Sequence, residues 1–408
     1  MRWALLATFL AGYAGISARR LRLLPVGRPA MALIAATLAV ALGAWAGPPF
    51  LDVDGALAAV ELHTLTLLLG MMLLGAGLAE AGFFQLATVR LAAAVKSRAG
   101  LLWAVTVGSG LLSAVLLNDA VCLLATPLVV QAARRARAPV KPFLFAVAMG
   151  SNAGSALTLA GNPQNMLVAR LSGLAYRDYL WRVAPAALAA LAVTAALLHW
   201  LFRKALAEDA PAPAEAVDAP VRRPLLAVSL VALAGTVVAN TAGVSLALSA
   251  AAAGAVVLLA ARDRAEKLVG LVDWSVLLFF AALFVLVATL QRTGFPAVWV
   301  AAAEGTFGHG TPALAAVLLL GSQVVSNVPL ILLLEPWVRS FPDAGLAWTV
   351  TALASTLAGN LTLLGSVANI IVLERARARL GFFEYLKVGL PVTAASVAVA
   401  LGALWATG

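Results

Sequence analysis

The sequence predicts an all-α polytopic membrane protein with about ten transmembrane helices and two opposed re-entrant hairpins in an inverted repeat. Composition carries the first part of this prediction: 63% of the 408 residues are hydrophobic, 11% are charged, and the mean hydropathy is +0.99. A soluble domain of this length could not bury so much apolar surface. The second part rests on an internal duplication and on polar residues that interrupt apolar segments at matching places.

The duplication is visible in two pairs of segments. Residues 61–83 read ELHTLTLLLGMMLLGAGLAEAGF and residues 273–295 read DWSVLLFFAALFVLVATLQRTGF, an alignment that pairs Glu61 with Asp273. Further along, 158–165 (TLAGNPQN) aligns with 362–369 (TLLGSVAN). A repeat of this length in so apolar a chain indicates a transporter whose two halves surround one central site.

Apolar segments that can cross a bilayer, at about 20 residues each, give ten crossings. They fall at 3–18, 30–46, 62–81, 142–159 with 163–172, 183–202, 224–240, 243–261, 274–291, 345–363 with 366–373, and 388–407. Two further apolar stretches carry a polar pair in the middle and are expected to enter and leave on the same side. Five crossings in each half turn the second half upside down relative to the first.

These segments divide the chain into two repeats and a linker. The first repeat covers 1–204, with a hairpin at 100–133 and a broken helix at 142–172. The second covers 224–408, with a hairpin at 312–338 and a broken helix at 345–373. Residues 205–223, which contain several Pro, Ala and acidic residues, read as a cytoplasmic linker.

The net charge of +10 follows the positive-inside pattern. If the N-terminus is outside, most basic residues face one side, including the cluster Arg19, Arg20, Arg22 and Arg28. Six arginines remain on the other side: Arg2, Arg170, Arg177, Arg182, Arg292 and Arg339. We therefore expect both termini outside, in a cytoplasmic (inner) membrane of the bacterial type. The expected partners of the protein are the lipid bilayer and a small-ion substrate, and nucleic acid is not expected.

Four polar interruptions carry the candidate chemistry. Helix breaks free backbone amides that attract anions, and they free carbonyls that, with Asn side chains, suit a small hard cation. The alternative is that these polar residues only cap hairpins or hold helices together. The residues concerned are Asn118 and Asp119; Ser151, Asn152, Gly161, Asn162 and Asn165; Ser326 and Asn327; and Thr356, Asn360, Gly365, Ser366 and Asn369.

Asp119 is the only carboxylate expected near the bilayer centre. An ionisable group at that depth indicates ion or proton coupling. The alternative is that Asp119 caps the returning arm of the hairpin. Cys122 is the single cysteine, so an internal disulfide is excluded.

Several motifs resemble the ion transporter superfamily, which contains arsenite-efflux permeases, citrate permeases and divalent anion/sodium symporters. They are LLNDAVCLLATPLV and VVSNVPLILLL at the hairpins, AGNPQNMLVA and LTLLGSVANIIV at the breaks, and VDWSVLLFFAALFVL. The resemblance covers nearly the whole chain and implies transport by an elevator-type motion. The chain departs from the dicarboxylate symporters, which have the sequence Ser-Asn-Thr at both hairpin tips.

The resemblance places the family's hairpin-tip site at Asn118, Asp119, Ser326 and Asn327 and its helix breaks at 161–165 and 365–369, and the polar interruptions described above supply the remaining candidate residues. The substrate would be bound by Asn118, Asp119, Ser326, Asn327, Asn162 and Ser366. The coupling ion would be bound by Asp119, Ser151, Asn152, Gly161, Asn165, Thr356, Asn360, Gly365 and Asn369. No cofactor or metal is expected beyond a bound Na⁺, and no Arg or Lys is expected at the central site.

The first functional hypothesis is a secondary active transporter of a small anion, coupled to Na⁺ or H⁺. The alternatives are an arsenite or metalloid efflux permease and a Na⁺/H⁺ antiporter. An intramembrane enzyme is not expected, because the sequence has no HExxH motif and no His near Ser151 or Ser326. A GxxxxGK[ST] loop is also absent from the sequence, so the chain has no such nucleotide site of its own. A partner ATPase and a homodimer both stay open.

Overall fold

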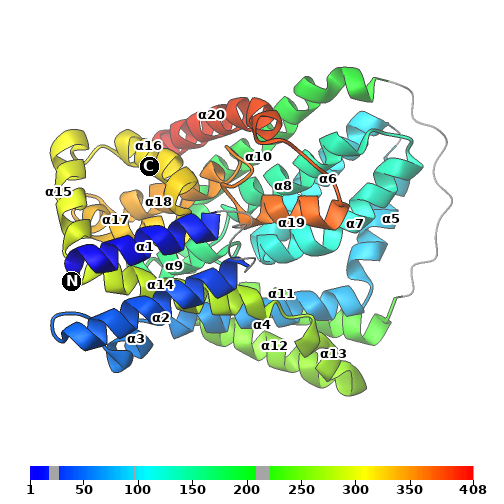
Figure 1. Ribbon diagram of the computed structural model, residues 1–408. Helices are drawn as coiled ribbons and strands as arrows, with labels where there is room; N and C mark the ends of the chain where they lie inside the picture. Colours follow the sequence, from blue (N-terminus) through cyan, green and yellow to red (C-terminus); the bar gives the residue numbers. More distant parts are fainter. Residues whose placement is uncertain (18–26, 96, 208–220, 408) are drawn as a thin grey trace.

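The structure is a computed structural model that describes residues 1–17, 27–95, 97–207 and 221–407. Throughout these residues the regular structure is helical, and no strand is present in them, as the sequence predicted. In Figure 1 most helices lie side by side, and the two chain ends lie at the same end of the molecule, here called the terminal end. The helices that flank the linker meet the opposite end, here called the linker end.

The helices of the two halves follow one another in the same order, from α1 with α11 to α10 with α20. The first half contains α1 (Arg2–Ser17), α2 (Arg28–Ala46), α3 (Val53–Ala58), α4 (Leu62–Glu80), α5 (Phe83–Ala94), α6 (Arg98–Val115), α7 (Asn118–Arg135), α8 (Val140–Ser155), α9 (Pro163–Ser172) and α10 (Tyr176–Leu206). The second contains α11 (Arg223–Thr241), α12 (Leu246–Ala261), the 3₁₀ turn η1 (Arg262–Arg264), α13 (Ala265–Gly270), α14 (Trp274–Gln291), α15 (Phe295–Phe307), α16 (Thr311–Val325), α17 (Asn327–Arg339), α18 (Ala344–Ala358), α19 (Val367–Ala376) and α20 (Phe382–Thr407).

Eight helices in the described part of the chain are long and apolar enough to cross a membrane. They are α2, α4, α6, α10, α11, α12 extended through α13, α14 and α20. Of these, α6 is an arm of the first predicted hairpin. The remaining predicted crossings correspond to α1, which has only 16 residues, and to the two broken helices α8–α9 and α18–α19. The chain is thus an integral, polytopic all-α membrane protein.

The helices pack in two layers. The base layer contains α1, α2, α4, α11, α12 and α14, and within it α4 packs along α12 while α14 packs along α2. The site layer contains α6 to α10 and α16 to α20, and α10 packs along α20 within it. Figure 1 shows α2, α4, α12 and α14 on one side and α6, α8, α10 and α20 on the other. The interface between the layers is where the polar interruptions meet.

Small residues allow close helix contacts inside each layer. A Cβ on Gly70 of α4 would lie 2.3 Å from the carbonyl carbon of Ala250 in α12. A Cβ on Gly154 of α8 would lie 2.1 Å from the carbonyl oxygen of Gly110 in α6. Backbones this close exclude any side chain, and such small-residue contacts are how helices associate in lipid. Each layer therefore packs tightly within itself.

Candidate substrate and ion site

Each hairpin tip is a short break between two helices. In the first half, α6 ends at Val115 and α7 begins at Asn118, with extended backbone at Leu116. The backbone amide of Asn118 donates to the carbonyl of Gly161 at 3.0 Å, which ties the tip to the break between α8 and α9. The backbone amide of Asp119 donates to Asn118 Oδ1 at 2.9 Å. The Asn118 side chain therefore accepts a hydrogen bond from a backbone amide in the first turn of its own helix.

The second tip has a different backbone. Ser326 separates α16 from α17 and has φ +62° and ψ 158°. This region of φ and ψ is essentially reserved for glycine, so a serine in it is strained, and such strain is concentrated at functional sites. Asn327 begins α17, and its Oδ1 is buried with no hydrogen-bond partner among the described residues. The second tip therefore presents an unpaired amide oxygen where the first presents a paired one.

The two helix breaks have matching internal hydrogen bonds. Asn165 Nδ2 donates to the carbonyls of Ser155 (3.2 Å) and Thr158 (2.9 Å). In the second half, Asn369 Nδ2 donates to the carbonyls of Gly359 (2.7 Å) and Thr362 (3.1 Å). Each asparagine thus satisfies carbonyls that its helix break leaves free, as buried backbone groups require.

The breaks are also bonded to each other across the repeat. Asn152 Nδ2 donates to Asn369 Oδ1 at 3.1 Å, and Asn152 Oδ1 accepts from Ser366 Oγ at 3.1 Å. Thr356 occupies the position of Asn152 in the other half. Its Oγ1 donates to Asn165 Oδ1 at 3.0 Å.

The remaining bonds of the network complete this symmetry. Thr356 Oγ1 accepts from Asn162 Nδ2 at 3.1 Å, just as Asn152 Oδ1 accepts from Ser366. All six residues are at least partly buried. We call them the cross-repeat network: Asn152, Asn162, Asn165, Thr356, Ser366 and Asn369.

Other predicted polar residues surround this network. Asn360 Oδ1 accepts from Asn152 Nδ2 at 3.0 Å, and Asn360 Nδ2 donates to the carbonyl of Met149 at 3.2 Å. Ser151 Oγ lies 2.8 Å from Ser113 Oγ and 3.3 Å from the carbonyl of Asn118. Asn118 Nδ2 donates to Asn152 Oδ1 at 3.3 Å. The structure thus brings the first tip and both breaks into one hydrogen-bonded group, whereas Gly161 and Gly365 contribute to it as backbone.

A cavity of about 1130 Å³ lies between the two layers. It reaches from the hairpin tips, at Asp119 and Ser326, to the residues that follow α19 and those that precede α2. One wall is mostly apolar, with Phe279 and Phe280 of α14. The opposite wall includes Gln323 and the residues of α19. Both tips are therefore accessible from the linker end.

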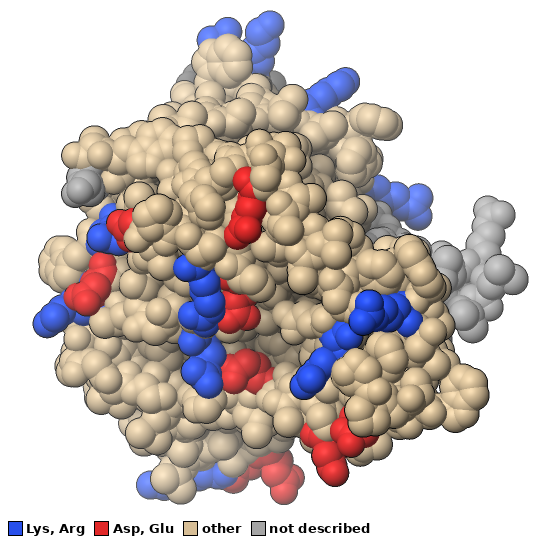
Figure 2. Space-filling view, turned by 90° about the vertical axis from the view of Figure 1, so that its left-hand side faces the viewer, with Lys and Arg blue, Asp and Glu red and all other residues tan. Residues whose placement is uncertain are grey.

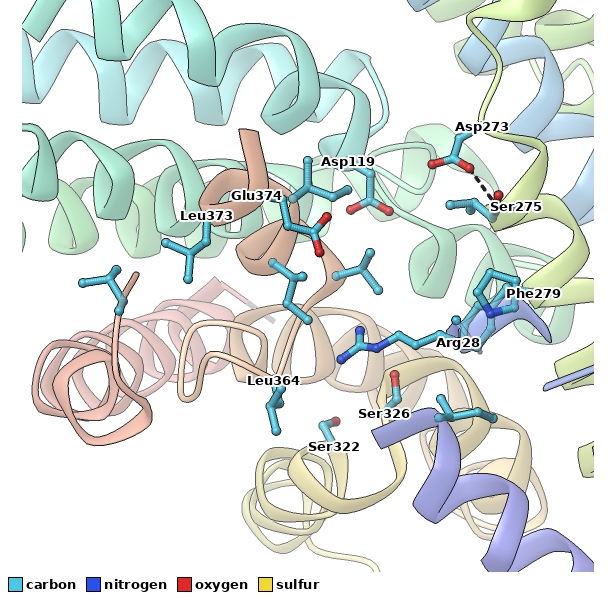
Figure 3. A pocket seen from close by; sticks show the side chains of 18 of the residues that line it. Arg28, Asp119, Asp273, Ser275, Phe279, Ser322, Ser326, Leu364, Leu373 and Glu374 are labelled. Atoms are coloured by element: carbon cyan, nitrogen blue, oxygen red, sulfur yellow. Dashed lines mark hydrogen bonds between the residues drawn. The ribbon is translucent and has the colours of Figure 1, made fainter. Parts of the chain in front are cut away.

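Asp119 faces this cavity and does not cap its helix. The N-cap of α7 is Leu117, with no side-chain cap. The Asp119 side chain lines the cavity at 8% exposure and accepts no hydrogen bond from the part of the chain that the structure describes. Figure 3 shows Asp119 between Glu374 and Asp273. This geometry leaves the carboxylate available to a ligand, and it does not match the capping interpretation.

Arginine is present in the cavity, contrary to the expectation that the central site has no Arg or Lys. Arg28 at the start of α2 lines the cavity, and Figure 3 shows its side chain extending between Ser326 and Glu374. Arg377 and Arg379 line the same cavity after the end of α19. The expectation was wrong because Arg28 was assigned to a basic loop, whereas it is the first residue of a helix that borders the site.

Gln323 is a second lining residue that the sequence analysis missed. Its Nε2 donates to the carbonyl of Ala358 and its Oε1 accepts from Thr362 Oγ1 at 2.7 Å. It thereby joins the hairpin arm α16 to the second helix break. The only sequence signal was a single amide side chain in an otherwise apolar arm.

The opposite end of the interface is closed. Glu61 at the start of α4 forms an ion pair with Arg170 of α9, with Arg170 Nε and Glu61 Oε2 3.4 Å apart. The pair lacks the geometry of a hydrogen bond. Gln291 Nε2 of α14 donates to the carbonyl of Leu332 in α17 at 3.1 Å. Both contacts join the base layer to the site layer at the terminal end, so the tips open to one side of the molecule.

Comparison with known proteins identifies the family. The citrate transporter family matches residues 13–358. The silicon efflux transporter LSI3 of Oryza sativa subsp. japonica is 31% identical, over 93% of this chain and 92% of the relative. The inner membrane protein YbiR of Escherichia coli K12 is 32% identical, over 82% and 85% of the two chains. The putative transporter arsB of Dictyostelium discoideum is 23% identical, over 91% and 86%.

A solved structure shares the fold. The YdaH transporter of Alcanivorax borkumensis superimposes with a TM-score of 0.54 at 18% identity, and the match covers 92% of this chain and 95% of that one. The family match, the apolar helices and the central polar site agree with one another. The chain belongs to the citrate transporter family of the ion transporter superfamily, and it is a membrane transporter of the anion and metalloid type, not an enzyme.

Proposed function

We propose that the chain is a secondary active transporter of a small oxyacid, coupled to Na⁺ or H⁺ and moved by an elevator-type displacement of the site layer. The observation that carries this proposal is the one-sided cavity. It ends at the two hairpin tips while an ion pair closes the other end of the same interface. Alternating access requires such a state, together with its inverted counterpart.

The tips favour a substrate with hydroxyl groups. Asp119, Ser326 and Ser322 line the cavity, and Ser322 Oγ has no hydrogen-bond partner among the described residues. A neutral hydroxylated acid, such as a metalloid hydroxide, can both donate to and accept from these groups. The carboxylate at the first tip opposes a dicarboxylate at that position.

A small oxyanion is the second candidate, and Arg28 is the observation that favours it. Its guanidinium extends toward Ser326 in Figure 3 and presents a fork of donors that matches oxyanions. An anion and the neutral acid differ in their need for this charge. Arg28→Gln should therefore weaken the binding of an anion in the open cavity more than the binding of a neutral acid.

The two layers support an elevator-type motion. The cross-repeat network ties α8 and α9 to α18 and α19 through buried hydrogen bonds, so these helices would move as one body. The contacts between layers include the Glu61–Arg170 pair and the Gln291 bond described above, both of which are exposed or partly exposed. Exposed contacts of this kind are weak. These two contacts are weaker than the buried hydrogen bonds of the cross-repeat network, and the interface also contains a partly buried bond from Tyr13 Oη of α1 to the carbonyl of Val325 in α16.

The charge distribution supports the proposed orientation. Several basic residues lie in or directly before helices that meet the linker end: Arg203, Lys204, Arg222, Arg264 and Lys267. Figure 2 views the terminal end, where acidic and basic side chains are interspersed. By the positive-inside rule, the linker end faces the cytoplasm and the cavity opens inward.

Transport by purified protein in liposomes tests this proposal. Uptake of arsenite, silicic acid, sulfate, phosphate, citrate, succinate and Na⁺ would be measured under imposed Na⁺ or proton gradients, with empty liposomes as the control. We expect saturable uptake of a metalloid acid or a small oxyanion that one of the gradients drives. An unsaturable leak, or concentrative uptake of Na⁺ alone, would contradict the proposal.

A further inference from the structure

The ion pair at the closed end has a repeat counterpart at the open end. Glu61 aligns with Asp273, and Arg170 aligns with Glu374 at the offset that also aligns Asn165 with Asn369. At the closed end the base layer supplies a carboxylate and the site layer supplies a guanidinium, with 3.4 Å between Arg170 Nε and Glu61 Oε2. At the open end both layers supply carboxylates. The charges of the two ends therefore do not follow the symmetry of the fold.

Asp273 and Glu374 both line the open cavity, on different layers. Asp273 caps α14 by accepting from the amide of Val276 at 3.2 Å, so its carboxyl group is fixed at the start of that helix. Glu374 lies in the last turn of α19 and is exposed. Figure 3 shows the two side chains with the open cavity beside them.

Closure of the linker end would bring these two carboxylates together. In an inverted repeat the second state exchanges the roles of the halves, so α19 would approach α14 as α9 now approaches α4. Two carboxylates at that separation repel each other. The second state therefore needs a positive charge between Asp273 and Glu374.

We propose that Arg28 is the positioning residue that supplies this charge, and that the Glu61–Arg170 pair is the latch that holds the present state. This inference rests on the alternating access of the proposed function. Arg28 belongs to α2, which packs against α14 in the base layer, so it stays with Asp273 when the site layer moves. In Figure 3 its side chain extends into the cavity between Ser326 and Glu374.

Other charged groups that line or border these positions do not replace Arg28. Arg377 and Arg379 follow Glu374 in the chain and are exposed at the cavity edge, so they move with the site layer. Asp119 adds a further negative charge to the cavity. At the closed end, His63 Nδ1 lies 3.7 Å from Glu61 and is mostly exposed, on the same helix as the latch carboxylate.

Thiol labelling of one cavity residue tests the inference without any transport measurement. In a Cys122→Ser background, Val276→Cys places a reporter on the cavity wall, and its rate of reaction with a polar maleimide follows the share of molecules whose linker end is open. Arg170→Gln removes the latch and should slow labelling by up to about five-fold, the range of a partly exposed ion pair. Arg177→Gln is the matched control, because Arg177 pairs with Asp178 of its own helix, at 3.5 Å.

The role of Arg28 is then tested by the same labelling measurement in the protein that already carries Arg170→Gln. Adding Arg28→Gln should restore fast labelling, because the two carboxylates then repel each other in the second state. Adding Glu374→Gln to both changes should slow labelling again. If Arg28→Gln leaves the Arg170→Gln rate unchanged, Arg28 is not the closing charge. If the labelling rate of that double variant also depends on Na⁺ concentration or pH, the closing charge is a cation from solvent.

Two outcomes separate this inference from the proposed function. Equal labelling of the Arg170→Gln and Arg177→Gln proteins would overturn the latch, whatever the liposomes transport. The expected labelling pattern in a protein that transports none of the tested solutes would uphold the two states and reject the proposed substrate class.

Discussion

Asn369→Ala tests whether the cross-repeat network holds the two halves of the site layer together. The substitution removes three hydrogen bonds: from Asn369 Nδ2 to the carbonyls of Gly359 and Thr362, and from Asn152 Nδ2 to Asn369 Oδ1. At about 1 kcal/mol each, the loss is on the order of 3 kcal/mol. For a chain of this length, that corresponds to a fall in Tm of about 3–4 °C.

The assay is thermal unfolding of purified protein in detergent, with Asn240→Ala as the matched control. Asn240 is a buried asparagine in the base layer whose Oδ1 accepts one side-chain hydrogen bond, from Ser249 Oγ. We expect Asn165→Ala to match Asn369→Ala, because its bonds are the symmetric equivalents. A fall in Tm no larger than that of the control would refute the network as a structural element.

The same variants address the coupling ion. Asn165 and Asn369 each use both amide hydrogens on carbonyls and accept one hydrogen bond, so each Oδ1 retains one lone pair. If those oxygens also bind a cation, either Asn→Ala change should raise the ion concentration needed for half-maximal transport. An unchanged ion dependence would leave the two residues with the structural role alone.

Three further predictions concern the tips and the linker. Asp119→Asn should fold in normal amounts, lose coupled transport and keep exchange; concentrative uptake with unchanged pH and Na⁺ dependence would place the coupling elsewhere. Ser326→Gly should raise Tm by relieving about 1–3 kcal/mol of backbone strain. Ser326→Ala keeps the strain and should not raise Tm, so equal Tm values for the two variants would contradict the strain at Ser326. Ala212→Cys lies in the linker, outside the described residues. In a Cys122→Ser background it should react with an impermeant thiol reagent only after the membrane is permeabilised. Labelling in intact cells would contradict the proposed orientation.

The polar interruptions were predictable from the sequence because Gly, Pro and Asn break apolar helices in recognisable ways. The breaks at Asn165 and Asn369 could be matched to each other because the two segments retain a similar sequence. Their actual partners could not be predicted. Asn152 and Thr356 align at the same offset as Asn165 and Asn369, but they form equivalent bonds with different functional groups, and those bonds run between segments about 200 residues apart.

The charged residues of the interface were harder to predict than the polar ones. Glu61 and Asp273 were assigned to span ends, and Arg28 to a basic loop, because hydropathy locates a residue along the membrane normal and says nothing about its neighbours. Arg170 and Glu374 were not recognised as equivalent positions of the two repeats, because a basic and an acidic residue show no sequence similarity. Only the packing of α4 against α9 shows that Glu61 faces Arg170.

The contrast between the network and the ends of the interface follows from what each must do. The network is formed within the site layer and must survive transport, so its two halves have kept equivalent hydrogen bonds. The ends of the interface differ between the two states, and two identical halves would make those states equal in free energy. One weak ion pair, worth about 1 kcal/mol, changes the ratio of the two states roughly five-fold. Departures from symmetry at Arg170, Glu374 and Arg28 are therefore enough to decide which side the empty transporter faces, and they leave the other state within reach of a bound substrate.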